Sequence, residues 1–289
     1  MSPIQAVTDP AELALAADIR NRLGLIPPLL EASERFQKAK GQERSQSAAD
    51  DRATAWMQLS HTVSHCMFMA ADNLRALCTL MMPDGEGLTT YAFAHYPLLR
   101  AAFEASSHAL WLVSPETQRE RIQRLLQTRA AETGYDFSLN KTLRKVGPNA
   151  PKDQQRLATE AAKIGDARHA KHMNKIREIA DASAIGHDDF VRLPGYGDIV
   201  AIAAEAADLN GSYATTVWQV LSGLSHPSTS RAVNFSALEP ISESVDGVTH
   251  NLLTADLRWV QAGLLASLAH YRMADSLIRA RMITPANGV

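Results

Sequence analysis

The sequence lacks the signals that mark several common classes of protein. Only two of its 289 residues are cysteine, so it has no disulfide framework and suits a reducing cytoplasm. No apolar run approaches the roughly 20 residues that a helix needs to span a bilayer. Residues 1–5 lack the basic and apolar regions of a signal peptide. We therefore expect a cytoplasmic protein that does not enter a membrane.

The usual phosphate-binding and metal-binding signatures are also missing. The chain has no Gly-x4-Gly-Lys-Ser/Thr loop, no Gly-x-Gly-x2-Gly and no Cys-x2-Cys pair. These absences argue against P-loop nucleotide hydrolysis, Rossmann redox chemistry and zinc fingers. The formal net charge of -2 neither favours nor excludes a charged partner.

What the chain does contain is helical periodicity. Hydrophobic residues make up 46% of the sequence, and over long stretches they recur three or four residues apart. Residues with high strand propensity do not alternate with polar residues over the length of a strand, so no strand is expected. The pattern predicts an all-α fold, a multi-helix bundle of about seven to nine helices. Two long core helices are expected over residues 51–82 and 251–282.

The expected organisation is a single all-helical domain over residues 1–289. Residues 1–48 form an N-terminal helical arm, and residues 119–182 form a basic helical hairpin insertion. Residues 225–248 are expected to form an irregular loop over the predicted site, because they contain no helical periodicity.

Several helix ends are marked by capping and breaking residues. Asp9, Pro10 and Glu12 have the spacing of a capping box with proline in the first turn, which predicts a helix start. The segment Gly147–Pro151 predicts a break, and the pattern after it predicts a helix over residues 152–182.

The segment Arg119–Arg177 is strongly basic. It contains 14 Lys or Arg residues against 6 Asp or Glu residues, whereas the rest of the chain is acidic. A block of this kind can attract RNA or another phosphate-bearing ligand. The alternative is a solvated helical hairpin whose basic side chains only cover exposed faces. Tyr135 and Phe137 are its only tyrosine and phenylalanine, so stacking of single-stranded nucleic acid is poorly supported.

One helical stretch, Tyr96–Val113, has a polar stripe on an otherwise apolar sequence. Arg100, Glu104 and His108 are spaced four residues apart and therefore share one face. A buried arginine and glutamate require partners, so one interpretation is an internal salt bridge that fixes helix packing. The other is an arginine that binds an anion or stabilises developing negative charge, with Glu104 orienting it.

A second stretch places Trp218, Ser222 and His226 at the same spacing, followed by Pro227. Proline disfavours helical geometry at the residue before it, which puts His226 at a helix C-terminus. That position suits a general acid or base, and it equally suits a histidine that caps the last carbonyl groups. Ser222 lies inside the helix without a Gly-x-Ser-x-Gly elbow, which disfavours a Ser-His nucleophilic pair.

If the two stripes face each other, their polar groups converge. We then predict His226, Arg100, Glu104 and Ser222 as catalytic residues. Arg100 and His108, together with Arg231, are predicted to bind an anionic ligand.

The pair His61 and His65 has the i, i+4 spacing of two metal ligands on a helix. Thr62 stands where the catalytic zinc signature has glutamate, and a third ligand from elsewhere in the chain is needed. With ten histidines in the chain, this spacing also arises by chance. We expect no metal and no cofactor, and keep a metal-dependent helical-bundle enzyme as an alternative.

Two short phrases give the chain a resemblance to a known group. Residues Tyr96–Glu104 (YPLLRAAFE) and Leu221–Pro227 (LSGLSHP) look like patterns in bacterial all-helical proteins that resemble the HEPN superfamily of helical nucleases. The resemblance covers about residues 50–130 and 210–282. It implies a helical dimer, common in toxin-antitoxin and phage-defence systems, that cleaves RNA without a metal. By matching roles, His226 moves protons and Arg100 stabilises charge at phosphorus.

The chain departs from the HEPN pattern in one respect. HEPN nucleases carry arginine and histidine in a single helix, separated by four to six residues. No arginine of this chain is followed by histidine at that spacing, because seven residues separate Arg100 from His108. The site is therefore either assembled from two helices or belongs to an inactive relative.

Three hypotheses for the function follow. The first is a metal-independent RNA-cleaving, HEPN-like effector, with a homodimer formed through the long helices. The second is a non-enzymatic binding or regulatory protein that holds an anionic ligand or a partner. The third is the metal-dependent enzyme that uses His61 and His65.

Overall fold

The structure is a computed structural model and describes residues 9–37, 41–147, 149–243, 246 and 249–286. The expectation for residues 1–5 and part of that for residues 225–248 lie outside the described residues. The chain divides into two compact units. The bundle unit comprises residues 1–41, 63–114 and 196–281, and the hairpin unit comprises residues 42–62, 115–195 and 282–289.

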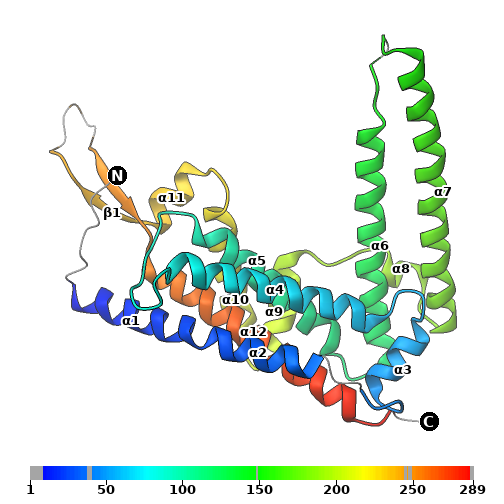
Figure 1. Cartoon of the computed structure of the whole chain (residues 1–289), viewed down its shortest axis with the longest axis horizontal. Coiled ribbons are helices and arrows are strands. Elements are labelled where there is room, and N and C mark those ends of the chain that lie inside the picture. Colours follow the sequence, from blue (N-terminus) through cyan, green and yellow to red (C-terminus); the bar gives the residue numbers. More distant parts are fainter. Residues whose placement is uncertain (1–8, 38–40, 148, 244–245, 247–248, 287–289) are drawn as a thin grey trace. The chain divides into compact units, whose positions relative to one another are not determined.

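The described residues are mainly helical, which confirms the predicted fold class in its coarse form (Figure 1). The helices labelled α1 to α12 are more numerous than the seven to nine expected. The expectation of no strand is wrong, because β1 (Ala237–Pro240) pairs with β2 (Asn251–Thr254) in an antiparallel ribbon. Each strand has four residues, which is too short to show an alternating pattern.

The bundle unit is built mainly from long helices. Their bounds are α1 (Pro10–Gly24), α2 (Ile26–Gln37), α5 (His95–Val113), α9 (Tyr196–Glu205), α10 (Gly211–Leu224), α11 (Thr229–Phe235) and α12 (Leu257–Ile283). The greater part of α4 (Leu59–Met81) belongs to the same unit. Segment 225–248, expected to be irregular, thus contains α11 and β1.

Helices α5, α9 and α10 pack against one another and carry the candidate site. Two contacts with α12 show how closely the helices approach. A Cβ atom added to Gly263 of α12 would lie 3.0 Å from Leu221 Cδ1 of α10. The buried Ser107 of α5 bonds His270 Nδ1 of α12 at 2.8 Å. Both contacts place α12 in the core of this unit, as its sequence pattern predicted.

Helices α1 and α2 are tied to α12 by buried or partly buried polar groups. Gln261 Nε2 donates to Asp18 Oδ2 at 2.7 Å, and Ser33 Oγ donates to Asp275 Oδ1 at 2.8 Å. The predicted start of α1 is confirmed, because the side chain of Asp9 accepts a hydrogen bond from the Ala11 amide.

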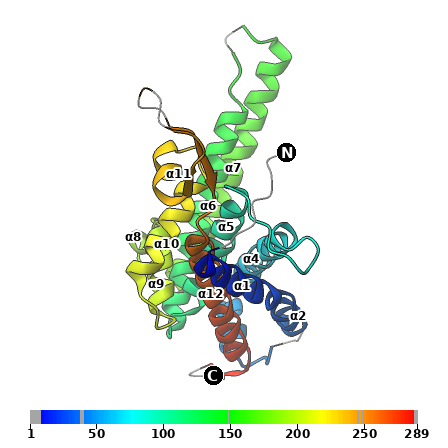
Figure 2. The ribbon, with the colours of Figure 1, turned by 90° about the vertical axis from the view of Figure 1, so that its left-hand side faces the viewer.

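The hairpin unit contains α3 (Gln46–Ala53), α6 (Gln118–Leu143), α7 (Lys152–Ala182) and the short α8 (His187–Phe190). Helices α6 and α7 pack against each other along the hairpin (Figure 2). The predicted helix over residues 152–182 is confirmed with the same bounds.

The two long helices predicted from the periodicity are shorter than expected. The helix expected over residues 51–82 is broken between α3 and α4, where Thr54 accepts a hydrogen bond from the Leu59 amide and Asp51 accepts one from Ser60. These side chains bond the first amides of α4, which favours a new helix start. Residues 251–254 form β2, and helix α12 begins only at Leu257, where Asp256 Oδ1 accepts a hydrogen bond from the Arg258 amide.

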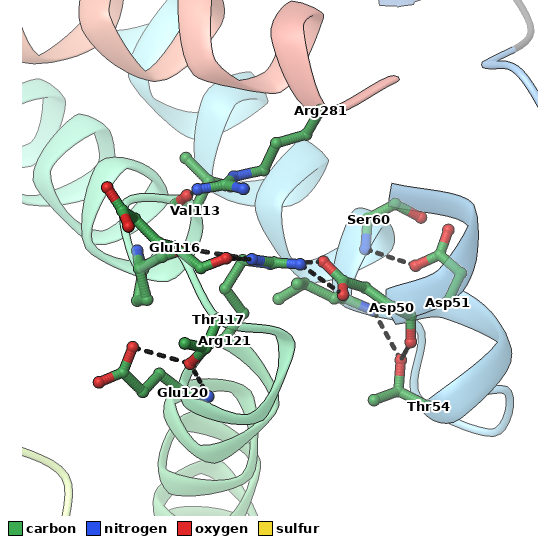
Figure 3. A network of polar contacts seen from close by, with 12 residues as sticks. Asp50, Asp51, Thr54, Ser60, Val113, Glu116, Thr117, Glu120, Arg121 and Arg281 are labelled. Carbon is green, nitrogen blue, oxygen red and sulfur yellow. Dashed lines mark hydrogen bonds and ion pairs between the residues drawn. The ribbon is translucent and has the colours of Figure 1, made fainter. Parts of the chain in front are cut away.

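A buried ion pair connects α3 with α6 in the hairpin unit (Figure 3). Arg121 donates from Nε to Asp50 Oδ2 at 2.6 Å and from Nη2 to Asp50 Oδ1 at 2.9 Å. Its Nη1 donates to the backbone carbonyls of Pro115 and Glu116. Both charged side chains are 2% exposed. Buried charges are tolerated in this arrangement because each one is paired and hydrogen-bonded.

None of the helices in the described part of the chain is long and apolar enough to cross a membrane.

Candidate functional site

The candidate site lies in the bundle unit, between α5 and the end of α10. Arg100 Nε donates to Glu104 Oε1 at 2.8 Å, one helical turn further along α5. The two side chains are 26% and 18% exposed, so they are partly withdrawn from solvent. The i, i+4 spacing that suggested this pair therefore produces a direct ion pair.

Arg100 also reaches His226, which follows α10. Arg100 Nη1 and His226 Nε2 are 2.9 Å apart. A guanidinium group can only donate, so Nε2 of His226 must be the acceptor in this contact. The imidazole is then neutral and carries its proton on Nδ1. Protonation of Nε2 removes the acceptor and leaves two positive charges side by side.

Trp218 is a part of the site that was not included among the predicted site residues. Its indole Nε1 donates to Glu104 Oε1 at 2.7 Å, so Glu104 accepts from both Arg100 and Trp218. The signal was present in the sequence, because Trp218 begins the stripe that ends at His226. Arg100 contacts His226, and Glu104, one turn further along α5, contacts Trp218, which lies earlier in the chain. Helices α5 and α10 therefore run antiparallel at the site.

The end of α10 explains why His226 is accessible. Ser225 is the C-cap residue, and its amide donates to the carbonyls of Leu221 and Ser222. The chain then leaves the helix at His226 and Pro227, as the proline predicted. His226 is exposed, whereas its partner Arg100 is partly buried. The site therefore consists of the accessible imidazole of His226 in contact with the guanidinium of Arg100, which Glu104 holds in place.

Ser222 and Arg231 lie near these residues with different contacts. Ser222 is partly buried on α10, one turn from both Trp218 and His226. No hydrogen bond joins Ser222 to His226 among the described residues. A Cβ atom added to Gly223 would lie 3.0 Å from Cγ and Cδ of Arg231, so the Arg231 stem lies against α10. Its guanidinium lies over the Phe235 ring.

His108 continues the α5 stripe but contacts a different set of residues. Its ring packs with Trp111 at 5.5 Å and with Tyr196 at 6.2 Å between ring centroids. It is 7% exposed, and burial lowers its pKa to about 4. His108 is therefore neutral at neutral pH and adds no positive charge for an anion.

The histidine pair on α4 remains two separate exposed side chains. His61 and His65 are both exposed. Among residues 9–37, 41–147, 149–243, 246 and 249–286, no group of three or more His, Cys, Asp or Glu side chains could hold a metal ion. The third ligand that the metal hypothesis requires is not provided within that part of the chain.

The basic block forms α6, α7 and their connection in the hairpin unit. Some of its cations are neutralised locally, since Arg129 pairs with Glu132 and Arg144 pairs with Asp166. Arg121 is buried with Asp50, so it does not contribute to a charged surface. Burial of Arg121 therefore removes one of the 14 basic residues of this block from its exposed surface.

Comparisons of this chain with protein-family models, with curated proteins and with solved structures found no match. The function is therefore inferred from the chemistry of the site.

Proposed function

We propose that the bundle unit contains a metal-independent ribonuclease site in which His226 transfers protons and Arg100 stabilises negative charge at phosphorus. The observation that supports this proposal is the 2.9 Å contact between Arg100 Nη1 and His226 Nε2. Acid-base and charge-stabilising groups must reach the same substrate, and these two groups meet.

In this reaction His226 Nε2 accepts the proton of a ribose 2′-OH. The 2′-oxygen forms a bond to the adjacent phosphorus, and the bond from phosphorus to the 5′-oxygen of the next nucleotide breaks. The leaving oxygen takes up a proton, either from the imidazolium or from water. The products are a 2′,3′-cyclic phosphate and a free 5′-OH, and no metal or external reactant is consumed.

The contacts of Arg100 suggest how substrate binding prepares the base. Nε of Arg100 is bonded to Glu104, and Trp218 fixes Glu104 from α10. This arrangement holds the guanidinium in place while Nη1 remains on an accessible imidazole. A phosphate that takes Nη1 as its partner releases the Nε2 lone pair of His226, which can then accept a proton.

The wider parts of the proposal rest on the resemblance to the HEPN superfamily. They are a HEPN-like relationship, a homodimer and a role in phage defence or a toxin-antitoxin pair. Two further parts rest on the sequence itself: RNA as the partner of the basic block rests on its charge, and a cytoplasmic location rests on the low cysteine content and the lack of a signal peptide. Departure from the single-helix HEPN spacing is compatible with the chemistry, because the contact of Arg100 with His226 brings the two groups together from different segments.

The test is RNA cleavage in the presence of EDTA by wild type and three single variants. His226→Gln and Arg100→Gln remove the base and the charge. His65→Gln removes an exposed histidine of the same unit and is the matched control. We expect wild type and His65→Gln to cleave, and the two site variants to lose at least about 100-fold in rate, since one acid-base group typically contributes 10²–10⁴-fold.

The chemistry of the products provides a second criterion. Cleavage through the 2′-OH leaves 2′,3′-cyclic phosphate ends, and a substrate with a single 2′-deoxyribose at the cleaved position should resist. Equal cleavage by all four proteins would identify a contaminating nuclease and sink the proposal. Cleavage of the 2′-deoxy substrate would exclude the reaction written above.

The alternative function is a non-enzymatic site that holds an anion. It is favoured by one observation, that the Nε2 lone pair of His226 is already engaged by Arg100. If none of the four proteins cleaves RNA, this alternative gains support. It predicts that inorganic phosphate raises the melting temperature of Arg100→Gln by less than that of wild type and His65→Gln.

A further inference from the structure

A separate cavity lies within the hairpin unit, between α6 and α7. Its volume is about 160 Å³. Pockets for drug-sized ligands are larger, roughly 300–1,000 Å³, so this cavity suits a single small group. The lining side chains that bear on its chemistry are Asp136, Phe137, Asn140, Arg168, His169 and His172.

Positive charge dominates around this cavity. Arg168 lines it, and no carboxylate in the described part of the chain forms a salt bridge with Arg168. Lys141 Nζ lies 4.4 Å from the centroid of the Phe137 ring, which also lines the cavity. The one acidic lining residue is Asp136. The cavity is therefore surrounded by more cations than anions.

The pKa of His172, which also lines the cavity, indicates the same excess of positive charge. Burial lowers its pKa, and the charges of Arg168, Arg129 and Lys171 lower it further. Asp136 acts in the opposite direction, but the net shift remains downward. Burial is the largest cause of the lowered pKa, and the added effect of three nearby cations indicates a positive field that favours an anionic ligand.

Hydrogen-bonding groups are also available. His169 is stacked on Phe137, with ring centroids 4.2 Å apart. Its buried Nδ1 has no hydrogen-bond partner among the described residues. Buried polar atoms are usually paired, so an unpaired one is available to bond a ligand in the cavity. Asn140 and Arg168 add amide and guanidinium donors on the cavity wall.

From the size, charge and donors of this cavity we propose that it binds a phosphate group. Phosphate is small enough for the volume, and Arg168 can bond two of its oxygens at once. The phosphate can be free or part of an RNA backbone, since both present the same group. The proposal does not depend on cleavage at Arg100 and His226, because it concerns binding alone.

The experiment follows the ring protons of His169 and His172 by NMR during titration with inorganic phosphate at constant ionic strength. Wild type is compared with Arg168→Gln and with Lys163→Gln. Lys163 is an exposed cation on the same helix that does not line the cavity, so its variant has the same change in charge. Arg168 is exposed, so its replacement should leave the fold intact.

We expect saturable shifts of both histidine signals in wild type and Lys163→Gln, and at least a tenfold weaker dissociation constant in Arg168→Gln. Shifts that rise linearly without saturation would overturn the proposal. Equal affinity of Arg168→Gln and Lys163→Gln would also overturn it, because binding would then follow net charge alone.

A second arm identifies the source of the phosphate. A short RNA with 2′-O-methyl riboses, which the reaction proposed above cannot cleave, is added to the phosphate-saturated protein. If RNA displaces phosphate and Arg168→Gln weakens RNA binding, the group belongs to a nucleic-acid backbone. If phosphate stays bound, the free anion is the ligand. Both results support a phosphate site and leave the cleavage proposal to its own test.

Discussion

Arg100 and His226 are 126 residues apart in the sequence, and their side chains meet at 2.9 Å. The contact joins α5 to His226, two residues beyond the end of α10. Glu104 orients the Arg100 guanidinium, which donates to Nε2 of His226 and remains partly exposed to solvent. The three side chains therefore form one unit, and changing any of them should affect the others.

The first prediction concerns Glu104→Gln. It removes the charge that holds Arg100 and weakens the hydrogen bond from Trp218. We expect the Trp218 indole N–H signal to move in NMR spectra while those of Trp56, Trp111 and Trp259 stay. RNA cleavage should fall by about tenfold, and the free energy of unfolding by less than about 1 kcal/mol, since the ion pair is partly exposed.

Glu86→Gln is the matched control, because Glu86 is an exposed carboxylate of the same unit. It should move no indole signal and leave cleavage unchanged. An unchanged Trp218 signal in Glu104→Gln would contradict the geometry of the site, whatever happens to activity.

Helix positions were predictable where local signals decide them. Asp9 caps α1 and Pro151 precedes α7, and in both places the expected start is observed. The break between α3 and α4 was not predictable from periodicity, because apolar spacing continues across it. Thr54 and Asp51 form the new helix start, because their side chains accept hydrogen bonds from amides five and nine residues further along the chain, and apolar spacing does not show such bonds.

The site was predictable as two stripes and not as a set of contacts. The spacing of Arg100 and Glu104 correctly indicated an ion pair. It also extended the stripe to His108, which the packing of α9 places against Tyr196 instead. Helical spacing defines which residues share a face, but only the packing of helices determines which neighbour each residue meets.

The second prediction concerns the buried pair of Asp50 and Arg121. Removing one partner leaves an uncompensated buried charge, so Asp50→Ala should lower the free energy of unfolding by about 3–5 kcal/mol. Glu178→Ala, which breaks the exposed pair with Lys175, is the control and should change it by less than about 1 kcal/mol. Urea denaturation measures both. Similar losses in the two variants would mean that Asp50 and Arg121 are not buried together.

The third prediction concerns acid sensitivity. Burial lowers the pKa of His95, His108 and His270 from 6.5 to about 4. The folded pKa lies below the unfolded value, so between these pH values the unfolded chain binds more protons. The stability gained by keeping these three histidines neutral is therefore fully present above pH 6.5, and it is lost as the pH drops toward 4. At pH 5.5 each histidine should cost roughly 1 kcal/mol relative to pH 7.5.

The variant His95→Phe separates this effect from the titration of carboxylates. Both ring nitrogens of His95 are buried without a hydrogen-bond partner in the described part of the chain. Phenylalanine removes these unpaired atoms, so stability at pH 7.5 should stay equal or rise. The loss between pH 7.5 and 5.5, measured by urea denaturation at each pH, should shrink by about 1 kcal/mol. An unchanged loss would show that His95 is not buried in its neutral form.

The fourth prediction compares two glycines inside helices. Alanine is favoured over glycine in a helix by about 1 kcal/mol. At Gly134 of α6 an added Cβ meets nothing within 4 Å, so Gly134→Ala should raise the free energy of unfolding.

At Gly263 of α12 the added Cβ would lie 3.0 Å from Leu221 Cδ1 and 3.1 Å from Cδ2. Leu221 is fully buried, so its side chain has little room to give way, and overpacking of this kind costs roughly 1–3 kcal/mol. We therefore expect Gly263→Ala to destabilise the protein. Urea denaturation of the two variants should give changes of opposite sign, and stabilisation by both would mean that α10 and α12 are not in close contact at Gly263.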